Sequence, residues 1–226
     1  EAPLFWQPEV DGRGFWVFTR YDDIVQMSKD WETYSSEVGG TSLEDLTPEE
    51  VEARKSMLDT DPPAHTRLRA LVNKGFTPRV EERIRGLARG ILAQAFERDA
   101  FDWVEDVASE IPMWVFSEIM GLPVEDRRLL IELGDKLLGN TDPEVVGEEN
   151  LRELTATDPS IRLLPFSSPF APELIDYGCR LGAARRTDPR DDVTTRLVEA
   201  EIDGSSLSEH EFGLFFILLT TAGNET

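Results

Sequence analysis

Apolar side chains recur at helical spacing through much of this chain. The clearest run lies between residues 80 and 96, where apolar positions are three or four apart: Ile84, Leu87, Ala88, Ile91, Leu92 and Ala95. This spacing predicts a helix with one buried face. The same pattern predicts helices over 20–28, 111–120, 124–138, 172–186 and 193–202. In the 124–138 helix, four leucines are expected to point inward: Leu129, Leu130, Leu133 and Leu137.

Two stretches near the N-terminus depart from this helical pattern. Residues 14–19 begin at a glycine and are otherwise bulky, aromatic and β-branched, which predicts a strand. Residues 37–56 are polar and acidic, and they predict a long loop with a short helix over 48–54. A small β region in a mainly α protein follows from these patterns.

Proline interrupts the segment between residues 140 and 172, so it cannot form one long helix. We expect a short helix near 144–154. The apolar loop over 163–170 fits a ligand entrance, a membrane-touching patch or packing against the body of the protein. The sequence leaves these three interpretations open.

The last long apolar run begins after Ser208. Glu211 follows three residues later, which is the pattern of a capping box at a helix start. The run continues to Thr221 with few polar positions. It predicts a helix buried on all sides.

A loop that feeds a helix lies between residues 57 and 75. Asp61 is placed to cap this helix with its side chain, and the two prolines that follow suit the first helical positions. His65 and Arg69 are four residues apart, so they share one helix face. Gly75 is expected to end the helix.

A neighbouring face of the same helix carries Leu68, Leu71 and Val72, which we expect to be buried. An arginine fork and a histidine N–H beside such a face can hold two carboxylates at the edge of a buried ligand. From the spacing alone, however, an ordinary solvated basic face is the commoner outcome.

The same stretch resembles a known family. Asp-Pro-Pro-Ala-His-Thr-Arg-Leu-Arg at 61–69, followed by Gly-Phe-Thr-Pro at 75–78, is similar to the C-helix region of bacterial cytochromes P450. In that family the histidine and the second arginine bind the haem propionates. The resemblance therefore implies that His65 and Arg69 bind the cofactor.

The end of the chain carries a second motif of that family. Ala-Gly-Asn-Glu-Thr at 222–226 looks like the oxygen-activation motif of the P450 I helix. The resemblance implies that Ala222 and Gly223 lie at the haem, and that Glu225 and Thr226 are catalytic residues that help deliver protons to the activated oxygen. Two motifs in this order are much more specific than either alone.

The resemblance covers the whole chain but only the N-terminal half of such a protein. It implies a mainly α fold with a small β region, in which residues 1–226 are a partial P450 domain from the B-helix region to the I helix. It also implies a monooxygenase with haem b that inserts one oxygen atom from O₂ into a small apolar substrate. Electrons would come from NAD(P)H through a ferredoxin-type donor. The motifs are most similar to those of the branch that oxidises sterol side chains and branched lipids.

The sequence departs from the family at the axial ligand. P450s use a cysteine thiolate from a late Phe-x-x-Gly-x-x-x-Cys-x-Gly loop, and no such loop occurs here. Cys179 is the only cysteine, and its neighbours favour a small core residue. We therefore expect a fragment of a P450 that is inactive alone, with no axial metal ligand of its own.

Two other interpretations remain open. The chain would be a haem-free, acidic, α-helical binding module derived from a P450 if it keeps this half without the cofactor. Cys179 would alternatively be a reactive thiol, although its neighbours supply no base to activate it.

Composition leaves the expected fold unchanged and bears only on the partners and the location of the protein. The net charge is −22 over 226 residues, which argues against nucleic acid and against anionic lipid. Near the first motif, Arg67, Lys74 and Arg79 would form a basic patch that suits an acidic ferredoxin. A single cysteine fits a cytoplasmic protein. We expect no signal peptide and no transmembrane segment.

Other chemical signatures are missing from the sequence. The two histidines, His65 and His210, have no partner at metal-ligand spacing. No glycine-rich phosphate loop and no nucleophile elbow is present.

Overall fold

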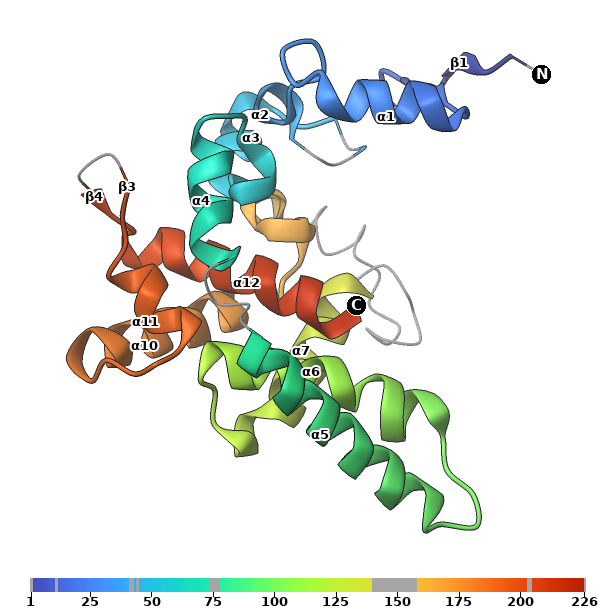
Figure 1. Ribbon diagram of the computed structural model, residues 1–226. Coiled ribbons are helices and arrows are strands. Elements are labelled where there is room, and N and C mark those ends of the chain that lie inside the picture. Colours follow the sequence, from blue (N-terminus) through green and yellow to red (C-terminus); the bar gives the residue numbers. More distant parts are fainter. Residues whose placement is uncertain are drawn as a thin grey trace.

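The computed structural model describes residues 2–10, 12–40, 43, 45–73, 78–139, 158–202 and 205–225. Helix α12 (Glu209–Glu225) lies near the middle of the molecule (Figure 1). The capping box is present as predicted: Ser208 N donates to Glu211 Oε2 at 2.8 Å, and Glu211 N donates to Ser208 Oγ at 3.2 Å. Residues 212–218 are all buried, which confirms the prediction of a buried helix.

Helix α10 (Ala171–Thr187) packs closely against α12. Two glycines of α10 make this approach possible. A Cβ atom on Gly178 would lie 2.7 Å from Phe216 Cβ, and one on Gly182 would lie 2.8 Å from Phe212 Cδ1. Tyr177 stacks on Phe216 with ring centroids 5.5 Å apart. The aromatic side chains of α12 therefore fill space that a larger residue on α10 would occupy.

Helices α6 (Glu110–Met120) and α7 (Arg127–Leu138) complete the core. Helix α6 follows a short π-helix, η2 (Val104–Ala108), and ends at Gly121 in the left-handed conformation that glycine favours, with φ +70°. A single turn, η3 (Val124–Asp126), leads into α7, and α5 (Pro78–Phe96) lies along α6.

Three of the four leucines predicted to point inward from α7 are buried: Leu130, Leu133 and Leu137. Leu129 is 41% exposed, so that part of the prediction is wrong. Leu129 lies one position from the buried stripe, where the helix turns towards solvent.

A buried ion pair ties the end of α6 to α10 and to α11 (Val193–Val198). Arg185 Nε donates to Asp192 Oδ2 and Arg185 Nη2 donates to Gly121 O, both at 2.5 Å. Asp192 also caps α11, because its Oδ1 accepts from Thr195 N at 2.8 Å. Helix α11 is shorter than predicted. Ile202 belongs instead to strand β3 (Glu201–Ile202), which pairs with β4 (Ser205–Ser206).

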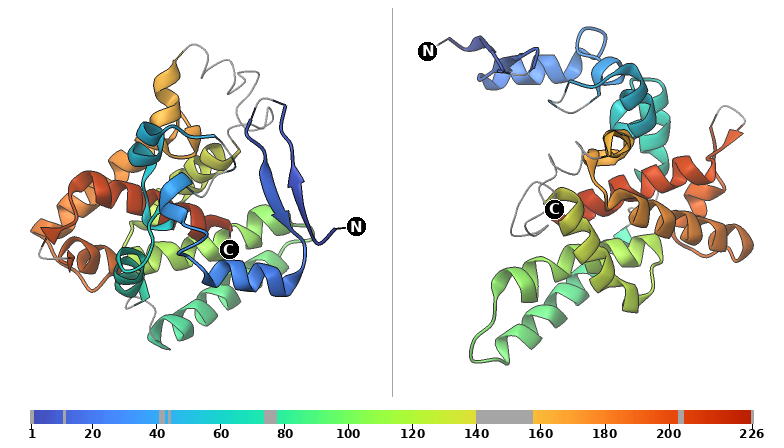
Figure 2. Two further views of the ribbon diagram at one scale, coloured as in Figure 1. Left: turned by 90° about the horizontal axis from the view of Figure 1, so that it is seen from above. Right: turned by 180° about the vertical axis from the view of Figure 1, so that it is seen from behind.

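The N-terminal region forms a hairpin and two helices that lie at one end of the molecule (Figure 2). Strand β2 (Phe15–Phe18) confirms the predicted strand. Its antiparallel partner β1 (Leu4–Gln7) is not predicted by the sequence pattern. Helices α1 (Tyr21–Lys29) and α2 (Ser36–Gly39) follow. None of the described residues between 2 and 40 is buried.

The acidic loop contains the short helix predicted over 48–54. Helix α3 (Pro48–Arg54) begins with a capping box in which Thr47 N donates to Glu50 Oε2 at 2.7 Å. A turn, η1 (Met57–Asp59), follows it. Two further turns, η4 (Pro159–Leu163) and η5 (Pro165–Ser167), lie beside α3. The helix predicted near 144–154 lies outside the described residues.

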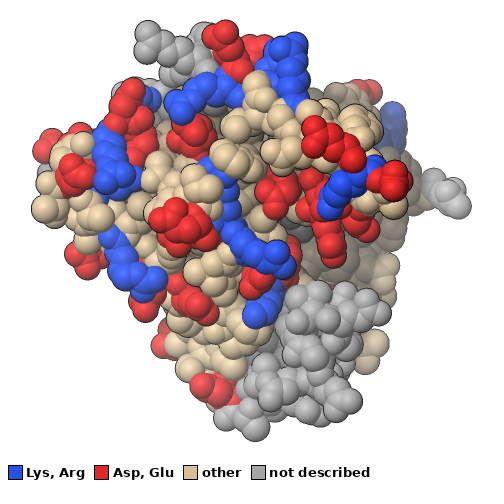
Figure 3. Space-filling view, turned by 90° about the horizontal axis from the view of Figure 1, so that it is seen from below, with Lys and Arg blue, Asp and Glu red and all other residues tan. Residues whose placement is uncertain are grey.

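The apolar loop over 163–170 packs mostly against the body of the protein, since Pro165, Ser167 and Ser168 are buried. Phe166 is the exception and is 44% exposed. In the described part of the chain, no helix is long and apolar enough to cross a membrane. Figure 3 shows acidic and basic side chains interspersed over one face of the molecule.

Candidate functional site

Helix α4 (Ala64–Asn73) carries the first motif and packs against α11. The predicted cap is wrong. The Asp61 carboxylate accepts from Ser35 Oγ at 2.5 Å and from Ser36 N at 3.1 Å, so it binds the start of α2 instead of α4. The two prolines after Asp61 form a turn before α4 and are not its first residues. The side chain of Asp61 is drawn away because the start of α2 offers N–H and O–H donors.

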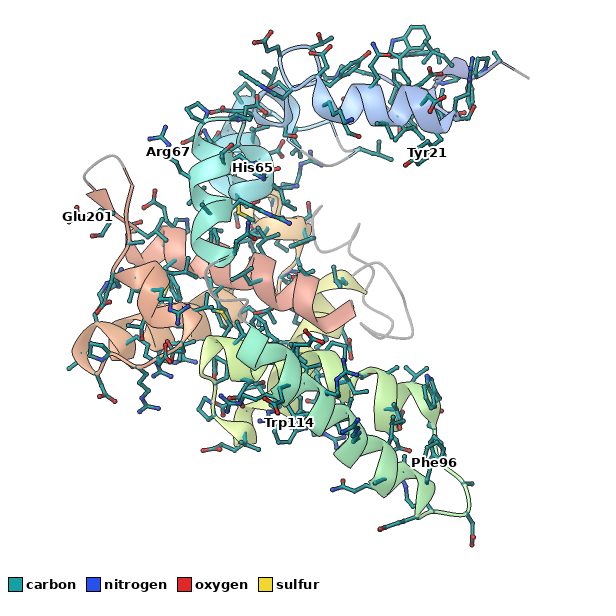
Figure 4. The ribbon with its side chains drawn as sticks, viewed as in Figure 1. Tyr21, His65, Arg67, Phe96, Trp114 and Glu201 are labelled. Carbon is teal, nitrogen blue, oxygen red and sulfur yellow. The ribbon has the colours of Figure 1, made fainter. Side chains whose placement is uncertain are left out.

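His65 and Arg69 share one face of α4, as their spacing predicts. His65 is half-buried and Arg69 is exposed. Arg67 lies on a different side of the helix and points outward (Figure 4). Among the described residues, neither the His65 nor the Arg69 side chain has a hydrogen-bond or ion-pair partner. Their N–H groups are therefore available for an anionic ligand.

The rest of the α4 prediction is tested only in part. Leu68 packs against the hydrophobic core as expected. The side chains of Leu71 and Val72 lie outside the described residues, as do Gly75 and Lys74. The side chain of Arg79 is likewise not described. The predicted basic patch is therefore represented by Arg67 alone.

The second motif lies at the C-terminal end of α12, which is a continuous helix to Glu225. Gly223 faces α6, because a Cβ there would lie 3.0 Å from Phe116 Cδ2. Ala222 is exposed. The side chain of Glu225 and the whole of Thr226 lie outside the described residues.

Two threonines before this motif are polar residues in an apolar helix. Their hydroxyls donate to carbonyls of the same helix, Thr220 Oγ1 to Phe216 O and Thr221 Oγ1 to Ile217 O, both at 2.8 Å. Such bonds satisfy a buried hydroxyl without another partner and often bend a helix.

An apolar pocket of about 470 Å³ lies where α12 meets α5 and α6. It contains Ala222 and Gly223 of the second motif and is lined by Ile84, Ile111, Pro112, Val115, Phe116, Ile119, Met120, Val193, Leu219, Ala222 and Gly223. No hydrogen bond or ion pair within the described ranges joins this pocket to His65 or Arg69. The structure therefore places the two motifs on separate helices, α4 and α12 (Figure 1).

A second pocket, of about 360 Å³, lies between α3, α7, η5 and a different face of α12. Its lining is mainly apolar and includes Leu46, Val51, Leu137, Phe166, Leu214 and Leu218. Arg54 and Asp59 are its charged lining residues. We call it the α3–η5 pocket.

An ion-pair network that the sequence does not predict lies beside this pocket. Glu50 is 7% exposed and forms an ion pair with Arg162. Arg54 donates a hydrogen bond to the backbone carbonyl of Arg162. The capping pattern from Thr47 to Glu50 was visible in the sequence. The partner was not, because Arg162 lies more than a hundred positions further along the chain.

The donor set of α4 fits a haem. An imidazole and a guanidinium one turn apart, both without described partners, suit the two propionates. The small residues Ala222 and Gly223 near the end of α12 suit the flat face of a macrocycle.

Cys179 does not fit as an axial ligand. Its Sγ donates to Glu209 O at 3.2 Å, and burial raises the pKa of the thiol. It is only half-buried, so it lies at the edge of the contact between α10 and α12 and not among the buried core residues that the sequence favours. Among the residues that the structure describes, no group of three or more histidine, cysteine, aspartate or glutamate side chains could hold a metal ion.

Curated relatives match the chain over its whole length. A steroid C26-monooxygenase of Mycobacterium tuberculosis is 32% identical over 100% of the chain, and a methyl-branched lipid omega-hydroxylase of the same organism is 33% identical over 100%. The chain spans about half of each relative, 52% in both cases. No protein-family model matches the chain.

Solved structures agree with these relatives. A cytochrome P450 of Mycobacterium marinum in complex with pseudoionone is 33% identical, with a TM-score of 0.82 over 99% of this chain and 54% of that one. A cytochrome P450 of the Bacillus subtilis bacillaene polyketide synthase is 32% identical, with a TM-score of 0.72 over 99% and 53%. In sequence and in fold, these 226 residues therefore correspond to the N-terminal half of bacterial cytochromes P450.

Proposed function

We propose that residues 1–226 are a partial P450 domain of a haem-thiolate monooxygenase that inserts one oxygen atom from O₂ into an apolar substrate. The observation that carries this proposal is the likeness of the whole chain to P450 structures, with a TM-score of 0.82 at 33% identity. The two motifs on α4 and α12 support it, because each lies on the helix that the resemblance requires.

The role of α4 is to hold the cofactor. His65 and Arg69 donate N–H groups to the two propionates of haem b, the arginine through its planar fork. When bound, the haem supplies the centre at which O₂ is activated. The half-buried position of His65 and the exposed position of Arg69 suit carboxylates at the rim of a buried ring.

The role of the C-terminal end of α12 is to deliver protons at that centre. Ala222 and Gly223 keep the helix surface small, and Glu225 and Thr226 move protons from water to the reacting oxygen.

The substrate is apolar and occupies the α3–η5 pocket, whose lining is mainly apolar. Steroid and methyl-branched lipid are the substrate classes printed in the names of the two relatives. We extend a sterol or branched-lipid substrate to this protein. Electrons come from NAD(P)H through a ferredoxin-type partner, which meets the protein near α4 and Arg67.

We also propose that the 226 residues alone are inactive. The axial thiolate must come from a segment outside them, because Cys179 is held as a thiol in the contact between α10 and α12. A thiol with a raised pKa is a poor ligand at neutral pH.

The proposal is tested on the product of the reading frame extended beyond Thr226. We expect it to bind haem and to show the red-shifted Soret band of a reduced, carbon-monoxide-bound haem thiolate. Residues 1–226 alone should not show this band. An extended product that binds no haem would overturn the proposal.

The site assignment has a matched control. In the extended product, Arg69→Leu should lower haem retention by about tenfold, because a charge-assisted pair of hydrogen bonds is lost. Arg67→Leu removes the same charge from another side of α4 and should leave haem retention unchanged. Equal retention in the two variants would remove Arg69 from the site.

A further inference from the structure

Two segments far apart in the sequence are joined beside the α3–η5 pocket. Arg162 of η4 donates from Nε to Glu50 Oε1 at 2.5 Å and from Nη2 to Glu50 Oε2 at 3.4 Å. Its Nη2 also donates to Asp45 O at 3.2 Å. One arginine of the later segment therefore holds two residues of the earlier one.

Arg54, at the end of α3 in the earlier segment, in turn binds the later segment. Its Nε donates to Arg162 O at 2.7 Å and its Nη2 donates to Ser167 Oγ at 2.6 Å. Each segment thus contributes an arginine that binds the other. We call Glu50, Arg54 and Arg162 the arginine clasp.

The clasp contacts η5, a turn whose backbone conformation is strained. Phe166 and Ser167 of η5 have φ values of +58° and +48°, in the left-handed region that side chains larger than glycine seldom occupy. Two such residues in succession persist only where surrounding contacts hold them. Ser167 is 3% exposed, and its hydroxyl is the group that Arg54 binds.

The strained turn forms one wall of the α3–η5 pocket. Phe166 and Arg54 both line it, opposite Leu137 of α7 and Leu214 of α12. Phe166 remains 44% exposed, so α7 and α12 do not hold it by burial alone. Its place in the wall depends on the turn that carries it.

The clasp contains a forked ion pair beside that turn, with its carboxylate nearly buried. Glu50 is 7% exposed, and a charge-assisted, forked contact to an arginine is among the stronger hydrogen-bonded arrangements. The Arg162 guanidinium holds the pKa of the Glu50 carboxyl at about 2, so the pair stays charged at neutral pH.

We propose that the arginine clasp is a set of positioning residues that hold Phe166 as a wall of the α3–η5 pocket and so set the length of the apolar ligand that the pocket admits. The proposal deepens the proposed function, because it rests on the assignment of this pocket to an apolar substrate. It does not depend on haem, and its test is made without haem.

The test uses residues 1–226, Nile red as a neutral apolar probe, and straight-chain alcohols of increasing length as competitors. We expect the wild-type chain to bind Nile red and to discriminate against the longest alcohols. Arg54→Met should relax this discrimination by about tenfold, a size typical of pocket-length selection. Hydrogen exchange of the peptide covering residues 159–168 should become faster in the same variant, while exchange in α10 stays unchanged.

The control is Arg128→Met, which removes an exposed arginine that pairs with Glu132 on α7 at 3.2 Å. It should leave both readouts at wild-type values. Phe166→Ala should relax the length discrimination without faster exchange at 159–168, because it removes the wall and keeps the clasp.

Glu50→Gln keeps the test decisive if Arg54→Met fails to fold. Glutamine can still cap α3 by accepting from Thr47 N with its single carbonyl oxygen. Its NH2 group replaces the other acceptor of Arg162, so this variant removes the charge and one hydrogen bond of the clasp. It should shift both readouts in the direction of Arg54→Met. Wild-type length discrimination in Glu50→Gln or in Phe166→Ala would overturn the proposal, and so would the absence of Nile red binding by the wild-type chain. Haem binding by the extended product decides the proposed function separately.

Discussion

Residues 212–218 of α12 are all buried, whereas none of the described residues between 2 and 40 is. Both regions are rich in aromatic side chains. In the helical bundle formed by α6, α7, α10 and α12, Phe212 and Phe216 are fully buried against glycines of α10. In the N-terminal region, Trp16 is 60% exposed and Tyr21 is 79% exposed.

The difference shows that aromatic content alone does not make a core. The bundle around α12 buries its rings because glycines let the helices approach, and a buried ion pair joins the helix ends. The N-terminal hairpin has a single layer, so one face of each ring stays open, and Trp6 and Trp16 meet only edge to face at 5.4 Å. Stability should therefore reside in the bundle and much less in the hairpin.

The largest loss of stability is expected from a substitution in the buried ion pair of the bundle, between Arg185 and Asp192. Asp192→Ala leaves the Arg185 charge buried without its partner and also removes the cap of α11. We expect the free energy of unfolding to fall by about 3–5 kcal/mol. Asp191→Ala removes the neighbouring, 91% exposed carboxylate that pairs with Arg196 and should cost less than about 1 kcal/mol. Urea unfolding followed by circular dichroism measures both, and equal losses would contradict the account.

The glycines of α10 give the next largest effect. Gly178→Ala places a Cβ 2.7 Å from Phe216 Cβ, and we expect it to destabilise the protein by about 1–3 kcal/mol through overpacking. Gly86→Ala on α5 is the matched control, because a Cβ there has nothing within 4 Å. The control should stabilise the protein by up to about 1 kcal/mol, from helix propensity alone. A stabilising Gly178→Ala would show that α10 and α12 are not in close contact.

A smaller, pH-dependent effect is expected at the arginine clasp. The Arg162 guanidinium lowers the pKa of Glu50 from 4.5 to about 2 in the folded protein. A depressed folded-state pKa stabilises the protein above the unfolded pKa, and this stability is lost as the pH falls from about 4.5 towards 2. Wild type should therefore be more stable than Glu50→Gln at pH 6, and the difference should shrink over that window. A difference independent of pH would mean that the Glu50 charge contributes nothing.

The smallest effect is expected in the hairpin. Trp16→Ser removes a large ring that is 60% exposed, and we expect it to change the free energy of unfolding by less than about 1 kcal/mol. Trp16→Phe keeps an edge-to-face partner for Trp6 and should be closer still to wild type. A loss comparable to that of Asp192→Ala would place the hairpin in the core.

Much of the fold could be predicted from local patterns. The α3 helix has the predicted bounds, and the capping box from Ser208 to Glu211 is present, because both signals depend on neighbours within one turn. Strand β1 escaped prediction because Leu4–Gln7 becomes a strand only through its pairing with β2. The capping role predicted for Asp61 is wrong for a related reason: its donors lie at the start of α2, 25 positions earlier.

The candidate site likewise has one part that local spacing predicts and one part that it does not. The shared face of His65 and Arg69 follows from four-residue spacing, and the structure reproduces it. The arginine clasp could not be predicted, because no local pattern relates Arg162 to Glu50 across 112 positions. Local spacing therefore predicts which residues share a helix face, but not which surfaces meet.

The measurement that tests the central claim most directly is the sequence of the gene beyond the codon for Thr226. The account predicts an open reading frame that encodes a Glu-x-x-Arg pair and then a Phe-x-x-Gly-x-x-x-Cys-x-Gly loop. A frame that stops directly after Thr226, or that continues without this cysteine, would contradict a haem-thiolate monooxygenase and leave a helical module derived from one.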